Sequence, residues 1–355
     1  MKKTVIALQL AVAFGIGIAS VPADATLTLR SAFQNSALSI DGWGTGGDAA
    51  GLQVDTPSGA IVQQAYLYSS DVSGSGLTGS ITFQGVVLNG GSGTLLAPNL
   101  HTANHEVFNV TSIVKPIVEA GPGGVINFSI SEQGSRDGQT LVVVYSHATT
   151  VGGTAIILDG ELSQGGDTTA LNFAAPYTGG NVIVSLASTF SFNGSGTSNV
   201  TGQVTNVDVT TSSQAIRRLT SCAGGNDDAN FANSNGSLIT VGGVGDSTAN
   251  PNPSCAGGAG DDELYNLGAG NSANASPFLA AGDTSLLLTT NNPSFDDFVY
   301  GLFFTSAFTI TQVDDEVIVG PPPPPPTNGV PVPGTALLMG LGLIALARVR
   351  KNRSS

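Results

Sequence analysis

The sequence predicts an all-β fold: a sandwich or jelly-roll-like body, with an N-terminal signal helix and a short C-terminal hydrophobic helix. Runs of four to eight β-branched or apolar residues recur, bounded by Gly, Asn, Asp or Ser. No body segment of 12 or more residues keeps a helical period, since Pro116 interrupts the nearest candidate, Asn109–Ala120. The 48 glycines supply turns.

The predicted strands follow one another along the body. The most regular are Ile61–Tyr68, Ser80–Leu88, Val107–Val114, Gly124–Ile130, Thr140–Ser146, Thr154–Leu158, Asn181–Phe192 and Asp297–Ile310. The less regular are Thr26–Arg30, Thr168–Phe173, Gly202–Val209, Ser237–Val241 and Thr284–Thr290. The segment Leu141–Tyr145 is apolar throughout, which predicts a central strand covered on both faces. Asn89-Gly90 and Asp159-Gly160 are predicted turns.

Composition excludes several classes of protein. Charged residues make up 10% of the chain, against about 25% in a typical soluble protein, and the net charge is −14. An acidic surface repels phosphate backbones, so nucleic acid is not an expected partner. The 41% hydrophobic content argues against general disorder. Residues 26–329 hold 24 acidic and five basic residues, a net charge of −19.

The N-terminus has the three parts of a secretory signal peptide. Lys2 and Lys3 precede the apolar run Val5–Val21, and Ala23 and Ala25 form a small-x-small cleavage site. We expect signal peptidase to cleave after residue 25, so that the body begins at residue 26. The alternative is an uncleaved N-terminal anchor.

The C-terminal sequence predicts a spacer followed by a short membrane anchor. Residues 320–329 form a Pro-rich linker, in which six consecutive prolines favour a stiff polyproline II conformation. The apolar stretch Ala336–Ala347 rises only about 18 Å as a helix, short of a ~30 Å hydrocarbon core. Arg348 and Arg350 then open a basic end that should stay cytoplasmic.

Residues 330–355 resemble the PEP-CTERM sorting signal of Gram-negative bacteria. Its proline box is formed by Val330, Pro331, Val332, Pro333 and Gly334, and the short helix and Arg-rich end follow. Val332 stands where the family usually has glutamate. The resemblance implies recognition and removal of the tail by an exosortase, after transient anchoring in the inner membrane. A plain membrane anchor is the alternative.

The body, residues 26–319, resembles a group of uncharacterised secreted bacterial surface β proteins. The matching segments are Ala65–Tyr68, Asn109–Val114, Gly138–Tyr145, Leu158–Gly160, Asp261–Tyr265, Gly282–Thr284 and Asn292–Asp297. This resemblance implies a surface or matrix role and no known reaction.

The two cysteines predict a disulfide. Cys222 and Cys255 each lie in a Ser-Cys-Ala-Gly-Gly pentapeptide, and an even count in an exported chain favours pairing. The bond would close a Gly- and Asn-rich excursion and stabilise it by roughly 3–4 kcal/mol in the chain-entropy model.

Acidic residues follow both cysteines, so the disulfide would bring them together. They are Asp227, Asp228, Asp261, Asp262 and Glu263. Ca²⁺ takes six to eight oxygen ligands, so these loops could hold calcium, and no other cofactor is predicted. The spacing matches no EF-hand or calcium repeat, and solvated acidic loops are the alternative.

Other candidate sites are weaker. His101 and His105 stand four residues apart, but Thr102 replaces the glutamate of the metalloprotease pattern. His147 reads as a strand-end residue, and no serine lies in a nucleophile elbow. Trp43, the only tryptophan, could face a sugar, although packing is the expected role. No catalytic residue is predicted.

Together these features predict an exported protein of the cell surface or extracellular matrix, with a structural or adhesive role. An enzyme is not expected. The alternative is a secreted polysaccharide-binding module or polysaccharide-active enzyme, and exopolysaccharide is the partner expected outside the cell. A deep cleft with convergent carboxylates or an aromatic platform would favour that alternative.

Overall fold

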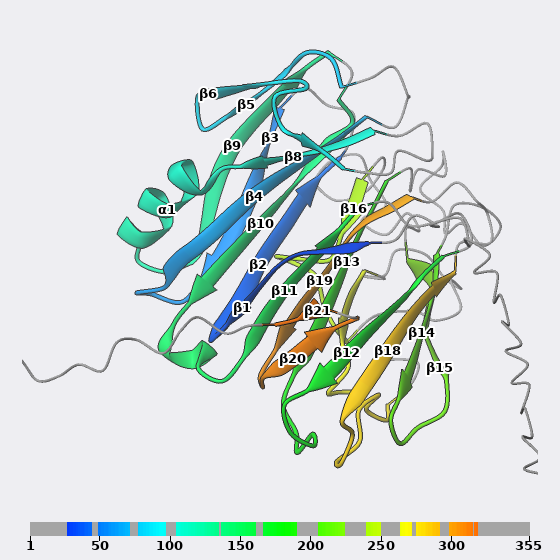
Figure 1. Ribbon diagram of the computed structural model, residues 1–355. Helices are drawn as coiled ribbons and strands as arrows, with labels where there is room; N and C mark the ends of the chain where they lie inside the picture. The colour runs from blue at the N-terminus through cyan, green and yellow to red at the C-terminus, as the bar shows by residue number, and fades with distance from the viewer. Residues whose placement is uncertain are drawn as a thin grey trace, which may run out of the picture.

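The computed structural model describes residues 27–44, 49–71, 77–96, 104–134, 136–160, 166–189, 205–223, 239–249, 263–271, 275–291, 298–314 and 316–318. The predicted signal peptide, the Pro-rich linker and the predicted sorting tail lie outside these residues, so the two terminal helices stay predictions. The body is antiparallel β-sheet, as the sequence predicts (Figure 1).

The first half of the body is a jelly roll. Its strands are β2 (Ser36–Trp43), β3 (Ala49–Thr56), β4 (Ile61–Asp71), β5 (Ser80–Phe83), β6 (Val86–Asn89), β7 (Thr94–Leu95), β8 (Asn104–Asn109), β9 (Gly124–Gln133) and β10 (Gly138–Ser146). The first and last main strands pair as β2·β10, and successive pairs move inward as β3·β9, β4·β8 and β5·β6. This winding forms a sheet ordered β2-β10-β4-β8-β7 and a sheet ordered β3-β9-β5-β6.

The second half repeats the same winding. Its strands are β11 (Thr154–Asp159), β12 (Thr168–Phe173), β13 (Val182–Thr189), β14 (Thr205–Thr211), β15 (Arg217–Ala223), β16 (Ile239–Val241), β17 (Leu264–Asn266), β18 (Ser285–Asn291) and β19 (Phe298–Ser306). The inward series is β11·β19, β12·β18, β13·β16 and β14·β15, while β17 pairs with β13. The body is therefore two jelly rolls in tandem.

Three further strands extend the second jelly roll. β1 (Thr28–Gln34) pairs with β11, so the first strand of the chain closes the edge of the second roll. β20 (Ile310–Val313) pairs with β12, and β21 (Glu316–Val317) pairs with β20. The sheets are ordered β1-β11-β19-β13-β16 and β15-β14-β18-β12-β20-β21.

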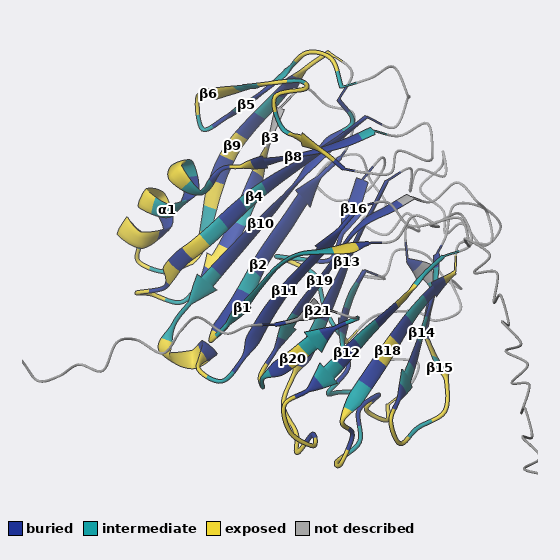
Figure 2. Cartoon of the chain, in the orientation of Figure 1, coloured by how far each residue is buried: buried dark blue, intermediate teal, exposed yellow. Residues whose placement is uncertain are grey.

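In the described part of the chain, four sheets enclose three apolar cores. One lies inside each roll, and the third lies between the sheet containing β10 and the sheet containing β19. Leu141 and Val143 of β10 belong to the core of the first roll, whereas Val142 and Val144 belong to the core between the rolls. The prediction that Leu141–Tyr145 is a central strand covered on both faces is confirmed. Figure 2 shows β10 buried along most of its length.

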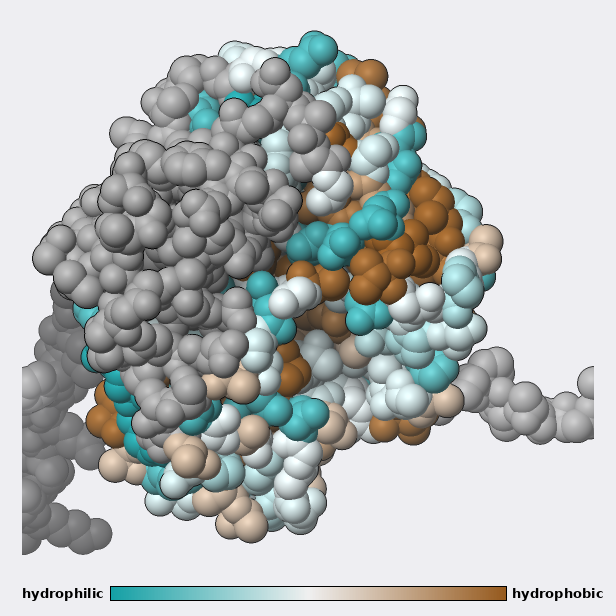
Figure 3. Space-filling model, turned by 180° about the vertical axis from the view of Figure 1, so that it is seen from behind, coloured by the Kyte–Doolittle hydropathy of each residue, from teal (hydrophilic) through white to brown (hydrophobic). Residues whose placement is uncertain are grey.

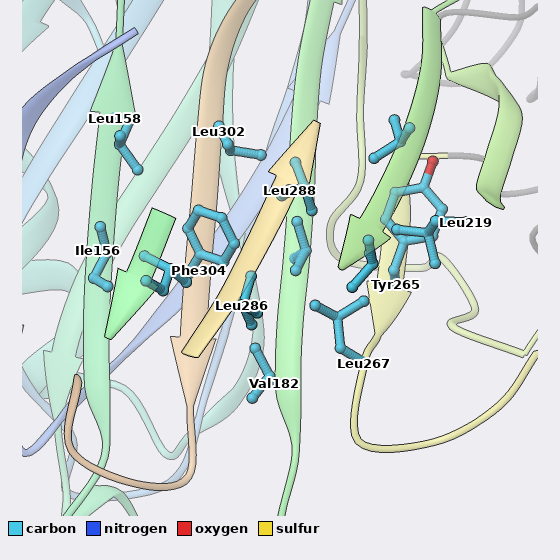
Figure 4. Close-up of a cluster of buried hydrophobic side chains, with 14 of the residues drawn as sticks. Ile156, Leu158, Val182, Leu219, Tyr265, Leu267, Leu286, Leu288, Leu302 and Phe304 are labelled. Atoms are coloured by element: carbon cyan, nitrogen blue, oxygen red, sulfur yellow. The ribbon is translucent and has the colours of Figure 1, made fainter. Parts of the chain in front are cut away.

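The core of the second roll is built from alternating residues of facing strands. Ile156, Val182 and Phe304 point inward from one sheet, and Leu286 and Leu288 point inward from the other (Figure 4). Leu287, between the last two, is 40% exposed. The period of two therefore places one face of β18 in the core.

The prediction that Val107–Val114 is a strand is half wrong. β8 ends at Asn109, and a helix, α1 (Thr111–Ala120), follows with Pro116 inside it. Val114 and Val118 are buried one helical turn apart, against β4. Lys115 Nζ donates to the Val62 carbonyl at 2.7 Å, so tertiary contacts hold the helix despite its proline.

Two other predicted strands are divided. Ser80–Leu88 is a hairpin, because Gln84 and Gly85 adopt positive φ angles of 49° and 77° and turn the chain between β5 and β6. Two residues with positive φ form the type I′ turn that suits tight hairpins. Asp297–Ile310 comprises β19 and the start of β20, separated at Ala307–Thr309.

Candidate functional site

A buried ion pair lies at one end of the first jelly roll. Arg136 Nη2 is 2.6 Å from Glu106 Oε1, and the two side chains are 0% and 1% exposed. Arg136 Nη1 donates to Ser69 Oγ at 2.9 Å. Glu106 Oε2 accepts from the Gly91 and Gly93 backbone N–H groups at 3.0 and 3.3 Å. The pair thus joins β4, β8, the segment before β10 and the loop after β6.

A second polar group bridges the two rolls. Tyr68 of β4 donates to Asp159 Oδ2 of β11 at 2.7 Å, and Arg30 of β1 forms an ion pair with the same oxygen. Burial raises the pKa of Asp159, and the bonds from Arg30 and Tyr68 oppose that shift. Burial, followed by the Asp159 charge, raises the pKa of Tyr68 well above its usual value.

A third polar group crosses the same boundary. Tyr300 of β19 shares a hydrogen bond of 2.6 Å with Thr140 of β10, and its ring stacks on His105 at a centroid distance of 4.8 Å. His105 Nδ1 is 2.8 Å from Ser70 Oγ. Burial raises the pKa of Tyr300. These groups can fix one roll against the other, because Tyr68 and Tyr300 each form a buried hydrogen bond across the boundary.

A cavity of about 370 Å³ opens beside β2, between the two rolls. Seen from behind, the described surface is hollowed between the rolls, with apolar residues around the hollow (Figure 3). Leu38, Ile40 and Phe303 supply apolar wall, while Tyr145 and Asp55 supply polar groups. Burial, followed by the Asp55 charge, raises the pKa of the Tyr145 phenol.

The structure places some of the predicted site residues. Trp43 is 3% exposed in the core of the first roll, which supports packing over sugar contact. His147 follows β10 directly, and its Nδ1 accepts from the Thr149 backbone N–H at 3.2 Å, as expected of a strand-end residue. His105 is buried in the polar group just described, whereas His101 lies outside the described residues.

The predicted disulfide and calcium site fall mostly outside the described residues. Cys222 lies in β15, but its side chain and Cys255 are not described. Asp227, Asp228, Asp261 and Asp262 are not described either, and Glu263 alone is placed, 1% exposed beside β17. Both predictions therefore stay predictions.

Asp283 holds a turn of the second roll together. Its Oδ1 accepts from the Thr211 hydroxyl at 2.8 Å and the Ser213 N–H at 2.9 Å, and its Oδ2 accepts from the Ala280 N–H at 2.7 Å. Burial alone would raise the pKa of Asp283, but these bonds and one from Ser212 outweigh it and lower the pKa. The Gly282–Thr284 segment thus has a structural role.

We expect Asp283→Asn to lower the free energy of unfolding by about 2 kcal/mol at pH 6, because the amide keeps one accepting oxygen and loses both the second acceptor and the charge that strengthens these hydrogen bonds. A lowered pKa stabilises the fold above the unfolded value of 3.8, and this contribution is lost as pH falls below it. The difference between the two proteins should therefore shrink between pH 5 and pH 3, measured by urea unfolding. The same difference in unfolding free energy at pH 6, pH 5 and pH 3 would contradict this explanation.

The cavity was not recognised from the sequence. Asp55 and Asp246 line it together with Tyr145, and they come from segments far apart in the chain. Tyr145 carried a weak signal, as an aromatic residue at the end of an apolar strand. No local motif joins the three residues, so only the fold brings them together.

Two absences hold for the described residues of the chain. Within them, no group of three or more His, Cys, Asp or Glu side chains is arranged to hold a metal ion. The helices placed in the structure include none long and apolar enough to cross a membrane.

Comparisons with known proteins add little to this geometry. No family model and no curated protein matches the sequence. Among solved structures, the major capsid protein P2 from bacteriophage PM2 is similar at a TM-score of 0.19 and 10% sequence identity, over 79% of this chain and 100% of that one. A likeness this low supports no conclusion about fold or function.

Proposed function

We propose that this chain is an exported protein of the cell surface or extracellular matrix, with a structural or adhesive role. The observation that carries the proposal is the joining of two jelly rolls through a shared apolar core and buried polar bridges. Such a joint favours a rigid unit, and the buried carboxylate Asp159 holds it through Tyr68, whereas the Arg136–Glu106 pair ties strands within the first roll. The proposal assigns the chain no reaction.

The sequence features supply the route in this proposal. Signal peptidase removes residues 1–25, and the basic C-terminus keeps the tail in the inner membrane until an exosortase acts on the box at Val330–Gly334. The Pro-rich linker separates the body from the membrane during this step. The predicted calcium site and disulfide extend the proposal. A calcium titration tests the first, and a count of free thiols tests the second.

A second candidate function is binding of polysaccharide. The cavity beside β2 favours it, because carboxylates and an aromatic side chain meet there on an apolar base. This function is compatible with the surface role, since an adhesive protein needs a ligand.

The route is tested by substituting the proline box in the full chain. We expect Pro331→Ala/Pro333→Ala to reduce the share of the protein in the surface and matrix fraction of the native host. Pro322→Ala/Pro324→Ala, in the linker, is the matched control and should leave that share unchanged. Equal distribution of the box variant and the unchanged protein would refute the sorting route.

A further inference from the structure

The edge of β2 is open where the equivalent edge in the second roll is closed. β2 and β11 are the first strands of the two rolls, and each pairs with the last strand of its own roll. β1 covers the other edge of β11, whereas the cavity lies along the other edge of β2. The repeat of topology thus identifies a place on the first roll that no strand of the described residues fills.

Two contacts limit the open part of this edge. The Leu38 N–H donates to Thr305 Oγ1 at 3.0 Å, and the Ile40 C=O accepts from the Val244 N–H at 2.8 Å. Alternate residues of an antiparallel strand turn both backbone groups to the same side, so the Leu38 C=O and the Ile40 N–H face the same edge. Neither has a hydrogen-bond partner within the described part of the chain. One acceptor and one donor are therefore available between the two contacts.

The span of this opening argues against a peptide strand as its occupant. An added strand needs a row of free N–H and C=O groups. Between the two contacts, only the Leu38 C=O and the Ile40 N–H lack a partner among the described residues, because Thr305 and Val244 bind the Leu38 N–H and the Ile40 C=O. At about 370 Å³, the cavity lies near the lower end of the range for small-ligand sites. A compact ligand fits better than an extended chain.

The charge of the lining selects against anions. Asp55 and Asp246 are the charged residues of the lining, and no Lys or Arg is among its described residues. Two carboxylates repel a negative ligand and accept hydrogen bonds from hydroxyl groups. The Ser39 and Thr305 hydroxyls each accept one backbone N–H, which leaves their own hydrogens available to a ligand.

We propose that this cavity binds one neutral pyranose unit of a carbohydrate. The ring hydroxyls would meet Asp55, the Tyr145 hydroxyl and the free backbone groups of β2, and the apolar ring face would lie on the wall formed by Leu38. A pyranose has hydroxyls at its rim and C–H groups on its faces, which matches a polar edge beside an apolar base. The inference deepens the polysaccharide-binding candidate and does not depend on the tail.

The test measures saturation-transfer difference NMR on the full chain with neutral methyl glycosides of glucose, galactose, mannose and N-acetylglucosamine. We expect binding of at least one of them below about 10 mM, and no binding of methyl glucuronide, which carries a carboxylate. Asp55→Ala and Tyr145→Phe should weaken that binding about tenfold, since each removes a polar partner. Gln53→Ala, on the same face of β3, and Tyr177→Phe, away from the cavity, are the matched controls and should bind normally.

Three results would overturn the inference: no signal from any neutral glycoside, equal binding of methyl glucuronide, or unchanged binding in both cavity variants. Tyr145→Phe keeps the ring, and its unfolding curve shows whether any loss reflects misfolding. A protein that reaches the cell surface yet binds no glycoside would remove this inference alone. A protein that binds a glycoside yet stays inside the cell would remove the surface role alone.

Discussion

Replacing Arg136 by alanine is expected to lower the free energy of unfolding by about 3–5 kcal/mol. The change leaves the Glu106 carboxylate inside the first roll without its guanidinium partner, and the two side chains are 0% and 1% exposed. It also removes the donor to Ser69 Oγ. Urea unfolding monitored by circular dichroism gives the difference directly.

The matched control for this prediction is Arg218→Ala. Arg218 forms an ion pair with Asp208 at 2.7 Å on the surface of the second roll, where its side chain is 41% exposed. Exposed ion pairs contribute about 0–1 kcal/mol, so this variant should remain close to the unchanged protein. If both arginine variants lose the same small amount, the Arg136–Glu106 pair does not stabilise the interior.

Leucines on the two faces of β18 should differ sharply when shortened. Leu286→Ala and Leu288→Ala are each expected to cost about 2–5 kcal/mol, because both side chains are at most 1% exposed in the core of the second roll. Leu287→Ala should cost under about 1 kcal/mol, since that side chain is 40% exposed. All three changes delete the same atoms, so the comparison isolates burial.

Thermal or urea unfolding of the three leucine variants provides the measurement. A large loss in Leu287→Ala with small losses in the other two would mean that β18 turns the opposite face to the core. A register shift of one residue turns every side chain of a strand to the opposite face. This outcome would therefore also change the register in which β18 pairs with β12 and β14.

The sequence pattern predicted most strands because apolar residues alternate or cluster where a sheet is covered. Leu141–Tyr145 was assigned correctly, since a strand buried on both faces is apolar throughout. The Leu-Leu-Leu run at residues 286–288 could not reveal which face is buried. That distinction depends on the neighbours that the fold brings to each side.

β2 was missed for a physical reason. Its segment Ser36–Trp43 carries Ser39 and Asp41, which read as loop residues. In the structure, Ser39 Oγ and Asp41 Oδ2 accept from the Asp55 and Gln53 backbone N–H groups of β3. These polar side chains join the two sheets of the first roll, a role that no local pattern indicates.

The tandem winding could not be predicted either. The first strand of each roll pairs with its last, so β2 meets β10 about a hundred residues later in the chain. Such pairings carry no local signal, and the sequence supported only a single sandwich or jelly-roll-like body. The cavity depends on this winding, because its lining comes from both rolls.

The most direct test of the proposed surface role is the mature C-terminus of the protein, read by mass spectrometry in the native host and in a strain without its exosortase. The account predicts a C-terminus at or near the box Val330–Gly334 in the host, and an intact tail ending at Ser355 in the strain without the enzyme. An intact tail in equal amount in both strains would contradict it.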